Sequence, residues 1–199
     1  MSLLFPLGRA HRHFLGLAKK GAPDPDDSIR PLDTVRISPQ AAQCFRSQLC
    51  VPGTFRSGPL FGNRADSILH VGYAAPAGYV HWMEYDPTQP FALDPGYVLG
   101  WTDALRMVHP EPIDWIGTWL SFPDTRGADR VREQPLIQQA RRELIADDTM
   151  ALLFVGWNQD EVEVHGYCAL ASTHGQPLTI EWMTAQASTL PSVSYTHLT

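Results

Sequence analysis

Large apolar side chains alternate with smaller or polar ones in several short segments, which is the pattern of half-buried β-strands. The clearest is residues 113–122, IDWIGTWLSF, where large side chains recur at period two. Residues 150–157, MALLFVGW, and residues 161–170, EVEVHGYCAL, flank the short connection NQD, so they predict a β-hairpin. Residues 177–183, PLTIEWM, predict a last strand.

The first half of the chain carries further strand signals between turn-forming residues. Residues 58–62, GPLFG, and residues 67–76, SILHVGYAAP, predict two strands joined by the turn NRAD. Another strand is predicted near residues 80–85, in a segment that also contains prolines.

Three segments combine helical periodicity with helix-start signals. Ser38 followed by proline predicts an N-cap and a first turn, and the helix should end before Pro52. Asp94 followed by proline opens a second helix, whose recurring apolar residues are Val98, Trp101, Leu105 and Val108. A third helix is predicted over residues 135–146. The order of elements predicts an α/β protein of the α+β type, with helices packed on a mixed sheet.

Composition divides the chain into three parts. Residues 1–33 combine a basic N-terminal segment with the Pro- and Asp-rich linker GAPDPDDSIRPLD. Residues 34–184 hold the predicted strands and helices and form the predicted domain, while residues 185–199 predict a flexible tail. Pro6 and Gly8 interrupt the apolar pattern of the basic segment, so we expect a frayed or docking terminus and no membrane contact.

The overall charge argues against a nucleic-acid partner. Of the 199 residues 44% are hydrophobic and 18% charged, and the formal net charge is -6. Sequence-independent nucleic-acid binding needs a basic face, which this balance does not favour. Cys44, Cys50 and Cys168 form no CxxC pair, and an odd number of such thiols is typical of reduced, buried cysteines in a cytoplasmic protein.

Catalytic motifs are sparse. The eight histidines form no HExxH or HxH pattern, and we expect structural roles for His70, His81 and His109. Ser121 and Asp124 do not belong to a GxSxG nucleophile elbow. The stretch GPLFGN does not lead into a helix, as a phosphate-binding loop would.

Three of these segments, taken in their order along the chain between about residues 35 and 167, resemble the MPN/JAMM domain family, also called JAB domains. VRISPQAAQCF is similar to the family's opening strand and first helix, SGPLFGNRADSILHV to its GxLxG strand and hairpin, and DWIGTWLSFPDT to the strand that ends in G-x-x-H-S-H-P. The resemblance implies a curved, cytidine-deaminase-like sheet. Active members of the family are zinc-dependent isopeptidases that remove ubiquitin or ubiquitin-like proteins.

The chain departs from the family pattern where the chemistry takes place. Matching Gly117, Ser121 and Pro123 to the G-x-x-H-S-H-P motif places Leu120 and Phe122 at the two zinc-binding histidines. Apolar side chains at these positions offer no ligand atom for zinc. We expect the two residues to project from the same side of the strand and to fill the former site as core.

Three further positions follow from the same alignment. Phe55 stands at the general-base glutamate, Arg130 at a serine, and Glu133 at the aspartate ligand. One carboxylate cannot hold zinc in an otherwise apolar pocket, so we expect neither a metal nor another cofactor.

The resemblance therefore implies a catalytically inactive protein-interaction or scaffold module, linked to ubiquitin-like or peptide-processing systems. Inactive family members pair with another MPN domain or bind a partner protein, which implies an MPN-like or ubiquitin-like partner and includes a dimer. Candidate anchors are the aromatics of residues 79–82 together with Phe91, Tyr97 and Trp101, although most aromatics of a domain belong to its core.

A second interpretation stays open, a metal-dependent isopeptidase or peptidase with a non-standard ligand set. Asp124, Asp129 and Glu133 follow the strand at residues 113–122 and could surround a divalent ion such as zinc with a nearby histidine. Carboxylates at this place also suit solvent exposure and the start of a helix. The sequence leaves a binding module and a hydrolase as alternatives. A third interpretation takes the basic N-terminal segment as an adaptor that brings the domain to a membrane surface or a larger complex.

Overall fold

The computed structural model describes residues 7–17, 30–78, 86, 88–127, 129–143, 145–168 and 175–184. Its helices and strands are α1 (Arg9–Phe14), β1 (Thr34–Ile37), α2 (Pro39–Leu49), β2 (Arg56–Ala65), β3 (Ile68–Ala74), α4 (Pro95–Val108), β4 (Asp114–Ser121), α5 (Arg130–Arg142), β5 (Ala151–Asn158), β6 (Glu161–Cys168) and β7 (Gln176–Trp182). The strand predicted near residues 80–85 and the predicted tail lie outside the described residues.

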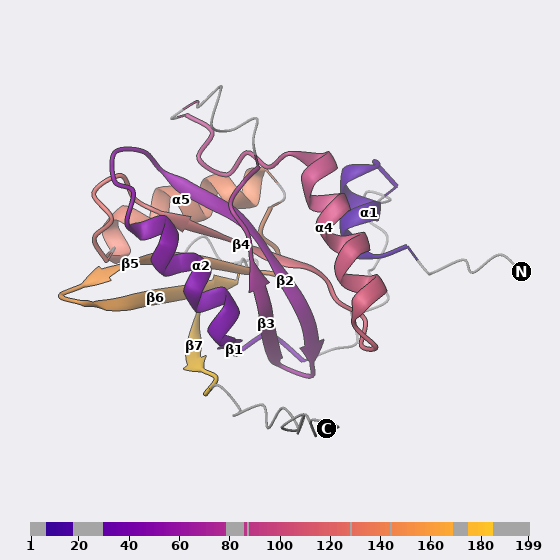
Figure 1. Cartoon of the computed structure of the whole chain (residues 1–199). Coiled ribbons are helices and arrows are strands. Elements are labelled where there is room, and N and C mark those ends of the chain that lie inside the picture. The colour runs from indigo at the N-terminus through magenta and orange to yellow at the C-terminus, as the bar shows by residue number, and fades with distance from the viewer. Residues whose placement is uncertain are drawn as a thin grey trace, which may run out of the picture.

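The seven strands close into a barrel in the order β1-β3-β2-β4-β5-β6-β7, and β7 pairs back to β1 (Figure 1). β1 is parallel to both neighbours and β4 is parallel to β5, while the other pairs are antiparallel. The α+β class and the mixed sheet are confirmed. The β2–β3 turn is shorter than the predicted NRAD, because Asn63, Arg64 and Ala65 continue the ladder with β3.

β4 lies between β2 and β5, and all its residues from Trp115 onward are buried. The period-two alternation predicted for residues 113–122 is wrong in one detail, because Ile116 has no opposing residue on β2 and forms a bulge. Trp115 and Leu120 consequently face one apolar core, whereas Ile116 and Trp119 face the other.

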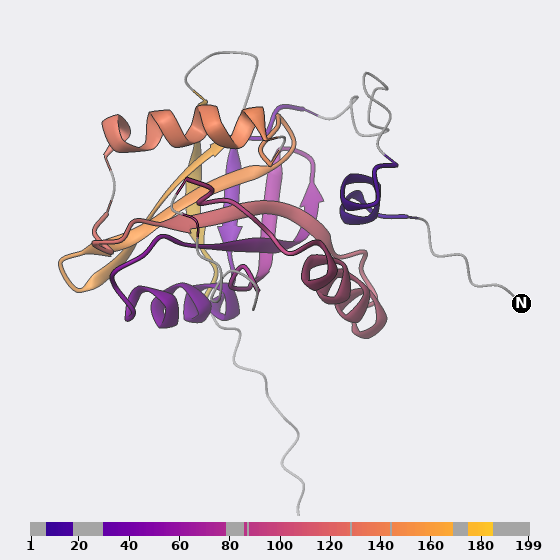
Figure 2. The ribbon, with the colours of Figure 1, turned by 90° about the horizontal axis from the view of Figure 1, so that it is seen from above.

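These two cores flank the sheet. One lies against α2, where the rings of Phe45 and Trp119 have centroids 5.6 Å apart. The other contains residues of α1, α4 and α5 together with Leu120 and Phe122. Figure 2 shows α2 and α5 on opposite sides of the sheet, with α4 and α1 toward one end.

The predicted caps of α2 and α4 are confirmed. Ser38 Oγ accepts a hydrogen bond from the Ala41 N–H at 3.1 Å, and Asp94 Oδ1 accepts one from the Tyr97 N–H at 3.1 Å. Val108 does not join the apolar face as predicted, because it is the last residue of α4 and its side chain is 72% exposed.

α5 begins at Arg130, five positions before the predicted start at Pro135. Asp129 Oδ1 accepts hydrogen bonds from the N–H groups of Val131 and Arg132 at 3.0 Å each, so the N-cap is this aspartate. Pro135 lies inside the helix and is exposed. A proline that is typical of a first turn therefore misplaced the predicted helix start.

The cysteines have three different environments. Cys168 is buried, Cys44 is half-buried and Cys50 is exposed, so the expectation of buried thiols is wrong for Cys50. Burial raises the pKa of both Cys44 and Cys168 to about 11, which keeps them as unreactive thiols near neutral pH.

The basic N-terminal segment contributes the short helix α1, which packs against α4 and β4 (Figure 1). Its residue Ala10 is completely buried. The segment thus docks on the domain, while the domain boundary at residue 34 stays a prediction. None of the helices in the described part of the chain is long and apolar enough to cross a membrane.

Replacing Gly117 tests the pairing of β4 with β5. A Cβ on Gly117 would collide with the Ala151 carbonyl oxygen, whereas a Cβ on Gly100 in α4 would meet nothing within 4 Å. We expect Gly117→Ala to lower the free energy of unfolding by about 1–3 kcal/mol, the usual cost of overpacking. Gly100→Ala should instead raise it by up to about 1 kcal/mol, because alanine favours helix. Urea unfolding followed by tryptophan fluorescence measures both, and equal stabilities would contradict this packing.

Candidate functional site

The two residues that stand at the implied zinc-ligand positions lie near the end of β4 and directly after it. Leu120 is completely buried and Phe122 is 5% exposed, and both belong to the core that includes residues of α5. Leu120 is opposite Phe154 in the β4–β5 register. Carbon atoms therefore fill the place where the resemblance implies two imidazoles.

An aromatic cluster, formed by Phe55, Phe122 and Phe154, closes the same end of the strand. The centroid of the Phe122 ring lies 5.7 Å from that of Phe55 and 6.0 Å from that of Phe154. The guanidinium carbon of Arg132 lies 4.2 Å from the Phe122 centroid, a cation–π contact. Each aromatic pair stabilises by about 0.5–1.5 kcal/mol beyond simple burial. Phe55, at the implied general-base position, is part of this packing.

Glu133 is a completely buried carboxylate in the first turn of α5. Its Oε2 accepts a hydrogen bond from the Tyr167 hydroxyl at 2.6 Å, and its Oε1 lies 2.7 Å from His165 Nδ1. Burial first, and then the hydrogen bond to Glu133 and its charge, raise the pKa of Tyr167 well above the ordinary range. The phenol of Tyr167 therefore stays protonated and donates a hydrogen bond to Glu133. These three residues form the Glu133 network.

His165 and Tyr167 were not predicted from the sequence as site residues. They are two residues apart on β6 and so face the same side of the sheet. The aromatic cluster meets the Glu133 network there, because the ring centroids of Tyr167 and Phe154 are 6.0 Å apart. The spacing of the two polar residues is visible in the sequence, but their position opposite Glu133 depends on how α5 crosses β6.

The remaining predicted positions lie apart from these contacts. Ser121 is completely buried, and its hydroxyl donates to the Phe122 carbonyl at 3.4 Å. Arg130 is exposed at the first residue of α5. The structure thus brings Leu120 and the aromatic cluster together, and it joins Glu133 to residues of β6.

The carboxylates of the alternative metal set are engaged by protein hydrogen-bond donors instead of facing one another. Partial burial pushes the pKa of Asp124 upward, but hydrogen bonds from Arg132 at 3.1 Å and from the Arg126 N–H outweigh it, and the pKa lies below its ordinary value. Asp129 caps α5, and Glu133 is held by its own network. Within the described ranges, no three His, Cys, Asp or Glu side chains gather in a way that could hold a metal ion.

Two of the candidate histidines, His70 in β3 and His109 directly after α4, lie apart from these contacts. His109 Nε2 is 2.8 Å from the Tyr73 hydroxyl oxygen, which gives this histidine a polar partner. Both residues, with His70, line a cavity of about 660 Å³. His81 lies outside the described residues.

The aromatic anchors that the structure describes, Phe91, Tyr97 and Trp101, lie in the core or pack against it. Phe91 is completely buried, which excludes it as an exposed anchor. Trp101 stacks on Phe61 with ring centroids 5.7 Å apart, and Tyr97 packs edge-on against Trp101 at 6.3 Å. The aromatics of residues 79–82 lie outside the described residues.

Comparisons with known proteins support the fold alone. No protein-family model matches the chain, and no curated protein matches its sequence. Among solved structures, the chain resembles the solution structure of protein DSY2949 from Desulfitobacterium hafniense, with a TM-score of 0.53 and 13% identity over 75% of this chain and 93% of that one. At this identity, the likeness shows a shared fold and carries no information about chemistry.

Substituting Glu133 tests whether its carboxylate is a structural group. Glu133→Gln keeps the shape but replaces one oxygen by an amide nitrogen that faces a donor, so we expect a loss of about 1–3 kcal/mol of unfolding free energy. Glu163 is a matched control, because its carboxylate lies 3.7 Å from the other nitrogen of His165 and is 36% exposed. Glu163→Gln should change stability by less than about 0.5 kcal/mol. Thermal and urea unfolding measure both variants, and equal losses would show that the buried network is unimportant.

Proposed function

We propose that residues 34–184 form a degenerate MPN/JAMM-like domain, with the family's curved, cytidine-deaminase-like sheet, that acts in the cytoplasm as a protein-interaction or scaffold module. The order of elements supports the proposal, because the three similar stretches fall on β1 and α2, on β2 and β3, and on β4. Gly117 of the third stretch lies where the backbones of β4 and β5 leave no room for a side chain.

The packing at the end of β4 is the observation that carries the proposal. Leu120 and Phe122 occupy the implied histidine positions as buried core, and Phe55 packs on Phe122 at the implied base position. A site that exchanges its ligands for apolar residues must not leave polar groups unpaired. The Glu133 network meets that condition, because both oxygens of the remaining carboxylate have partners.

The residues present do not fit zinc. A catalytic zinc site needs three protein ligands and an open position that activates water. Leu120 and Phe122 offer no lone pair, and Glu133 is engaged by His165 and Tyr167. A general base is also missing at Phe55, so the same positions supply neither the metal nor the proton acceptor that isopeptide hydrolysis needs.

The implied partner is a protein. Inactive members of the family bind another MPN-like domain or a partner protein, and we extend this to an MPN-like or ubiquitin-like partner, including a second copy of the chain. The net charge of -6 does not favour nucleic acid.

Metal content and hydrolysis together test the inactive site. Protein purified from zinc-supplemented medium should carry far less than one zinc per chain. It should not cleave ubiquitin-like isopeptide substrates with added zinc, cobalt or manganese. Stoichiometric metal with chelator-sensitive cleavage would overturn the proposal and favour Asp124, Asp129 and Glu133 as ligands. Asp124→Asn and Asp129→Asn keep local hydrogen bonding and should leave the metal content unchanged.

Restoring the implied ligands tests the family resemblance separately. Leu120→His/Phe122→His places two imidazoles beside the core that contains Glu133, and we expect it to bind zinc much more tightly than the wild-type chain, with a raised melting temperature when zinc is added. Leu120→His alone is the matched control with a single new ligand. Circular dichroism verifies the fold, and a folded double variant that binds zinc no better than the single one would contradict the alignment.

A further inference from the structure

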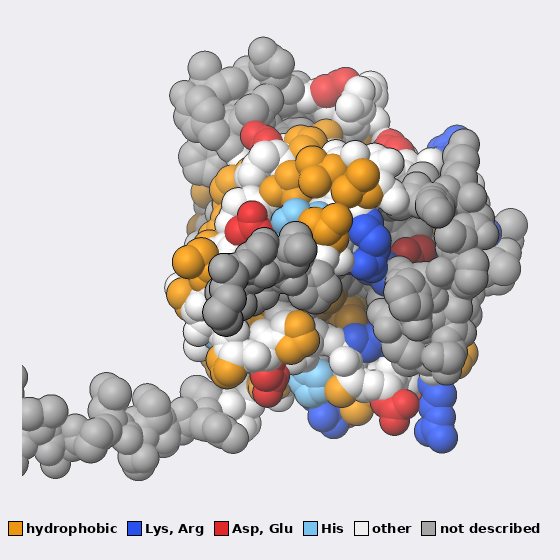
Figure 3. Space-filling view, turned by 90° about the vertical axis from the view of Figure 1, so that its right-hand side faces the viewer, with side chains coloured by type: hydrophobic (Ala, Val, Ile, Leu, Met, Phe, Trp, Pro, Cys, Tyr) orange, Lys and Arg blue, Asp and Glu red, His pale blue; other side chains and the backbone are white. Residues whose placement is uncertain are grey.

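α1 packs its apolar side on the first residues of β4. Ala10 is completely buried. The rings of His13 and Phe14 each have centroids 5.0 Å from that of Trp115, so both cover its indole. Figure 3 shows this face of the molecule, where hydrophobic, histidine and arginine side chains gather. The six-residue helix is too short to be stable alone, so its helical form depends on this contact.

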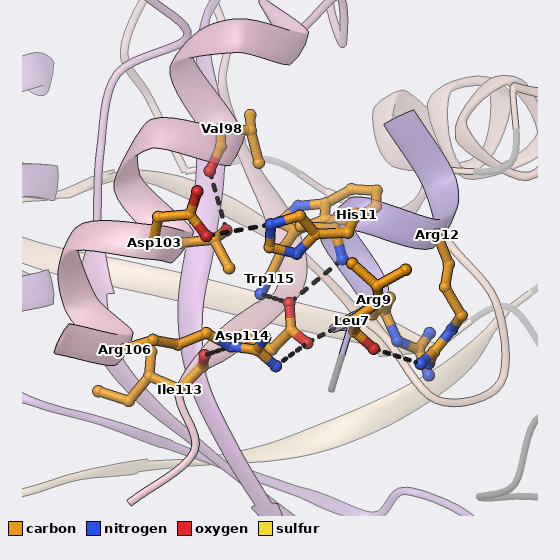
Figure 4. Close-up of polar contacts among 12 residues, drawn as sticks. Leu7, Arg9, His11, Arg12, Val98, Asp103, Arg106, Ile113, Asp114 and Trp115 are labelled. Carbon is orange, nitrogen blue, oxygen red and sulfur yellow. Dashed lines mark hydrogen bonds and ion pairs between the residues drawn. The ribbon is translucent and has the colours of Figure 1, made fainter. Parts of the chain in front are cut away.

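A carboxylate of the barrel caps the start of α1. Asp114 Oδ2 accepts a hydrogen bond from the Arg9 N–H at 2.6 Å, and Asp114 Oδ1 accepts one from the Ala10 N–H at 3.2 Å (Figure 4). These N–H groups have no acceptor within a helix of their own, and Asp114 supplies one from a distant strand. Arg106 of α4 holds the carboxylate in place at 3.2 Å. Gly8 leaves no room for a side chain beside Asp114.

Charge pairs at the rim set the register of the helix. His11 Nε2 lies 3.0 Å from Asp103 Oδ1 of α4, and Arg9 Nη1 lies 3.0 Å from Asp147 Oδ2 (Figure 4 shows the first pair). Asp103, Asp147 and Asp114 thus place acidic groups opposite the basic N-terminal segment. Trp115, Asp114, Arg106, Asp103 and Asp147 together form what we call the α1-docking surface.

The contacts that α1 makes with the barrel are of a kind that can break without unfolding the barrel. Side chains and a helix cap make them, and α1 does not share a strand ladder with the barrel. The sequence predicts a Pro- and Asp-rich linker between α1 and β1. Leu32 is completely buried and Asp33 is hydrogen-bonded to Ser67, so the reach comes from residues 18–29, which could span up to roughly 40 Å when extended. That reach is enough for α1 to meet the docking surface of a neighbouring molecule.

We propose that the α1-docking surface is a protein-interaction site whose partner is the α1 of a second copy of this chain. A second copy carries the matching acidic surface and basic helix by identity, so exchange needs no new contact. The linker gives the internal α1 an effective concentration in the millimolar range, so the internal contact dominates in dilute solution and exchange grows with protein concentration. The inference rests on the proposed interaction role and gives it a surface.

Two complementary variants of the full chain test the exchange. Ala10→Arg puts a charge on the buried side of α1, so this variant cannot use its own helix and leaves its docking surface free. Asp114→Ala removes the cap acceptor, so this variant keeps a competent helix without a surface to hold it. Each alone should be monomeric, and the mixture should form a one-to-one complex in sedimentation and fluorescence energy transfer.

A matched control separates docking from added charge. Leu15→Arg carries the same new charge on an exposed side chain of the segment, 54% exposed, and keeps its own α1 docked. When Leu15→Arg replaces Ala10→Arg in the mixture with Asp114→Ala, the complex should be at least about tenfold weaker, because the docking surface of Leu15→Arg is already occupied by its own α1. If Asp114→Ala does not fold, Asp103→Lys/Asp147→Lys reverses two exposed charges instead. Folded variants that stay monomeric when mixed would overturn the proposal. Because the experiment uses no metal and no isopeptide substrate, its failure is distinguishable from failure of the inactive-site proposal.

The burial of His13 predicts how exchange depends on pH. Burial first lowers the pKa of His13 below its ordinary value, Asp147 acts in the opposite direction, and Arg9 lowers it further. The docked state therefore favours the neutral imidazole, and docking is strongest above pH 6.5 and weakens as the pH falls through that value. The complex of the two variants should dissociate several-fold more readily at pH 5.5 than at pH 7.5.

Neighbouring charges define the control for this pH effect. His11 faces Asp103, which is 63% exposed, so this ion pair is weak. Asp114 and Arg106 also face α1, from β4 and α4. His13→Gln should remove most of the pH dependence, while His11→Gln should keep it. If the complex showed the same pH dependence with His13→Gln as with His13, the burial of His13 would not be the cause of that dependence.

Discussion

The position of β4 is the constraint on which the rest of the structure depends. The strand is hydrogen-bonded to β2 on one side and to β5 on the other, and Gly117 allows the backbone contact with β5. A slip of one residue would turn every side chain to the opposite face, so pairing on both sides fixes the register. The first residue of β4, Asp114, caps α1, and the packing around Leu120 fills its other end.

The hydrogen-bond partners of Glu133 explain how the core beside the C-terminal end of β4 can bury this carboxylate without leaving its charge unpaired. A buried carboxylate costs several kcal/mol unless hydrogen bonds replace its lost water. Tyr167 and His165 provide these bonds, and the aromatic cluster packs beside them. Glu133, which stands at an implied ligand position, is thereby a structural part of the core, and this is consistent with the proposed interaction role.

Local signals predicted much of the fold and less of the site. The caps at Ser38 and Asp94 act over a few residues, so sequence alone located α2 and α4. The same reasoning misplaced the start of α5, because Pro135 resembles a first-turn proline while the acting cap is Asp129. At the site, the burial of Leu120 could be predicted from strand spacing, but the partners of Glu133 could not.

The sequence by itself determined the residue types that decide the chemistry and the local periodicities that form strands and helices. Leu120 and Phe122 are apolar whatever the fold, and their spacing of two gives them one face of a strand. Only the tertiary structure decided that β7 closes the barrel against β1, that β6 meets Glu133 and that Asp114 caps α1. Caps and alternation depend on neighbours along the chain, whereas these contacts join distant segments, and their geometry exists only after the barrel has closed.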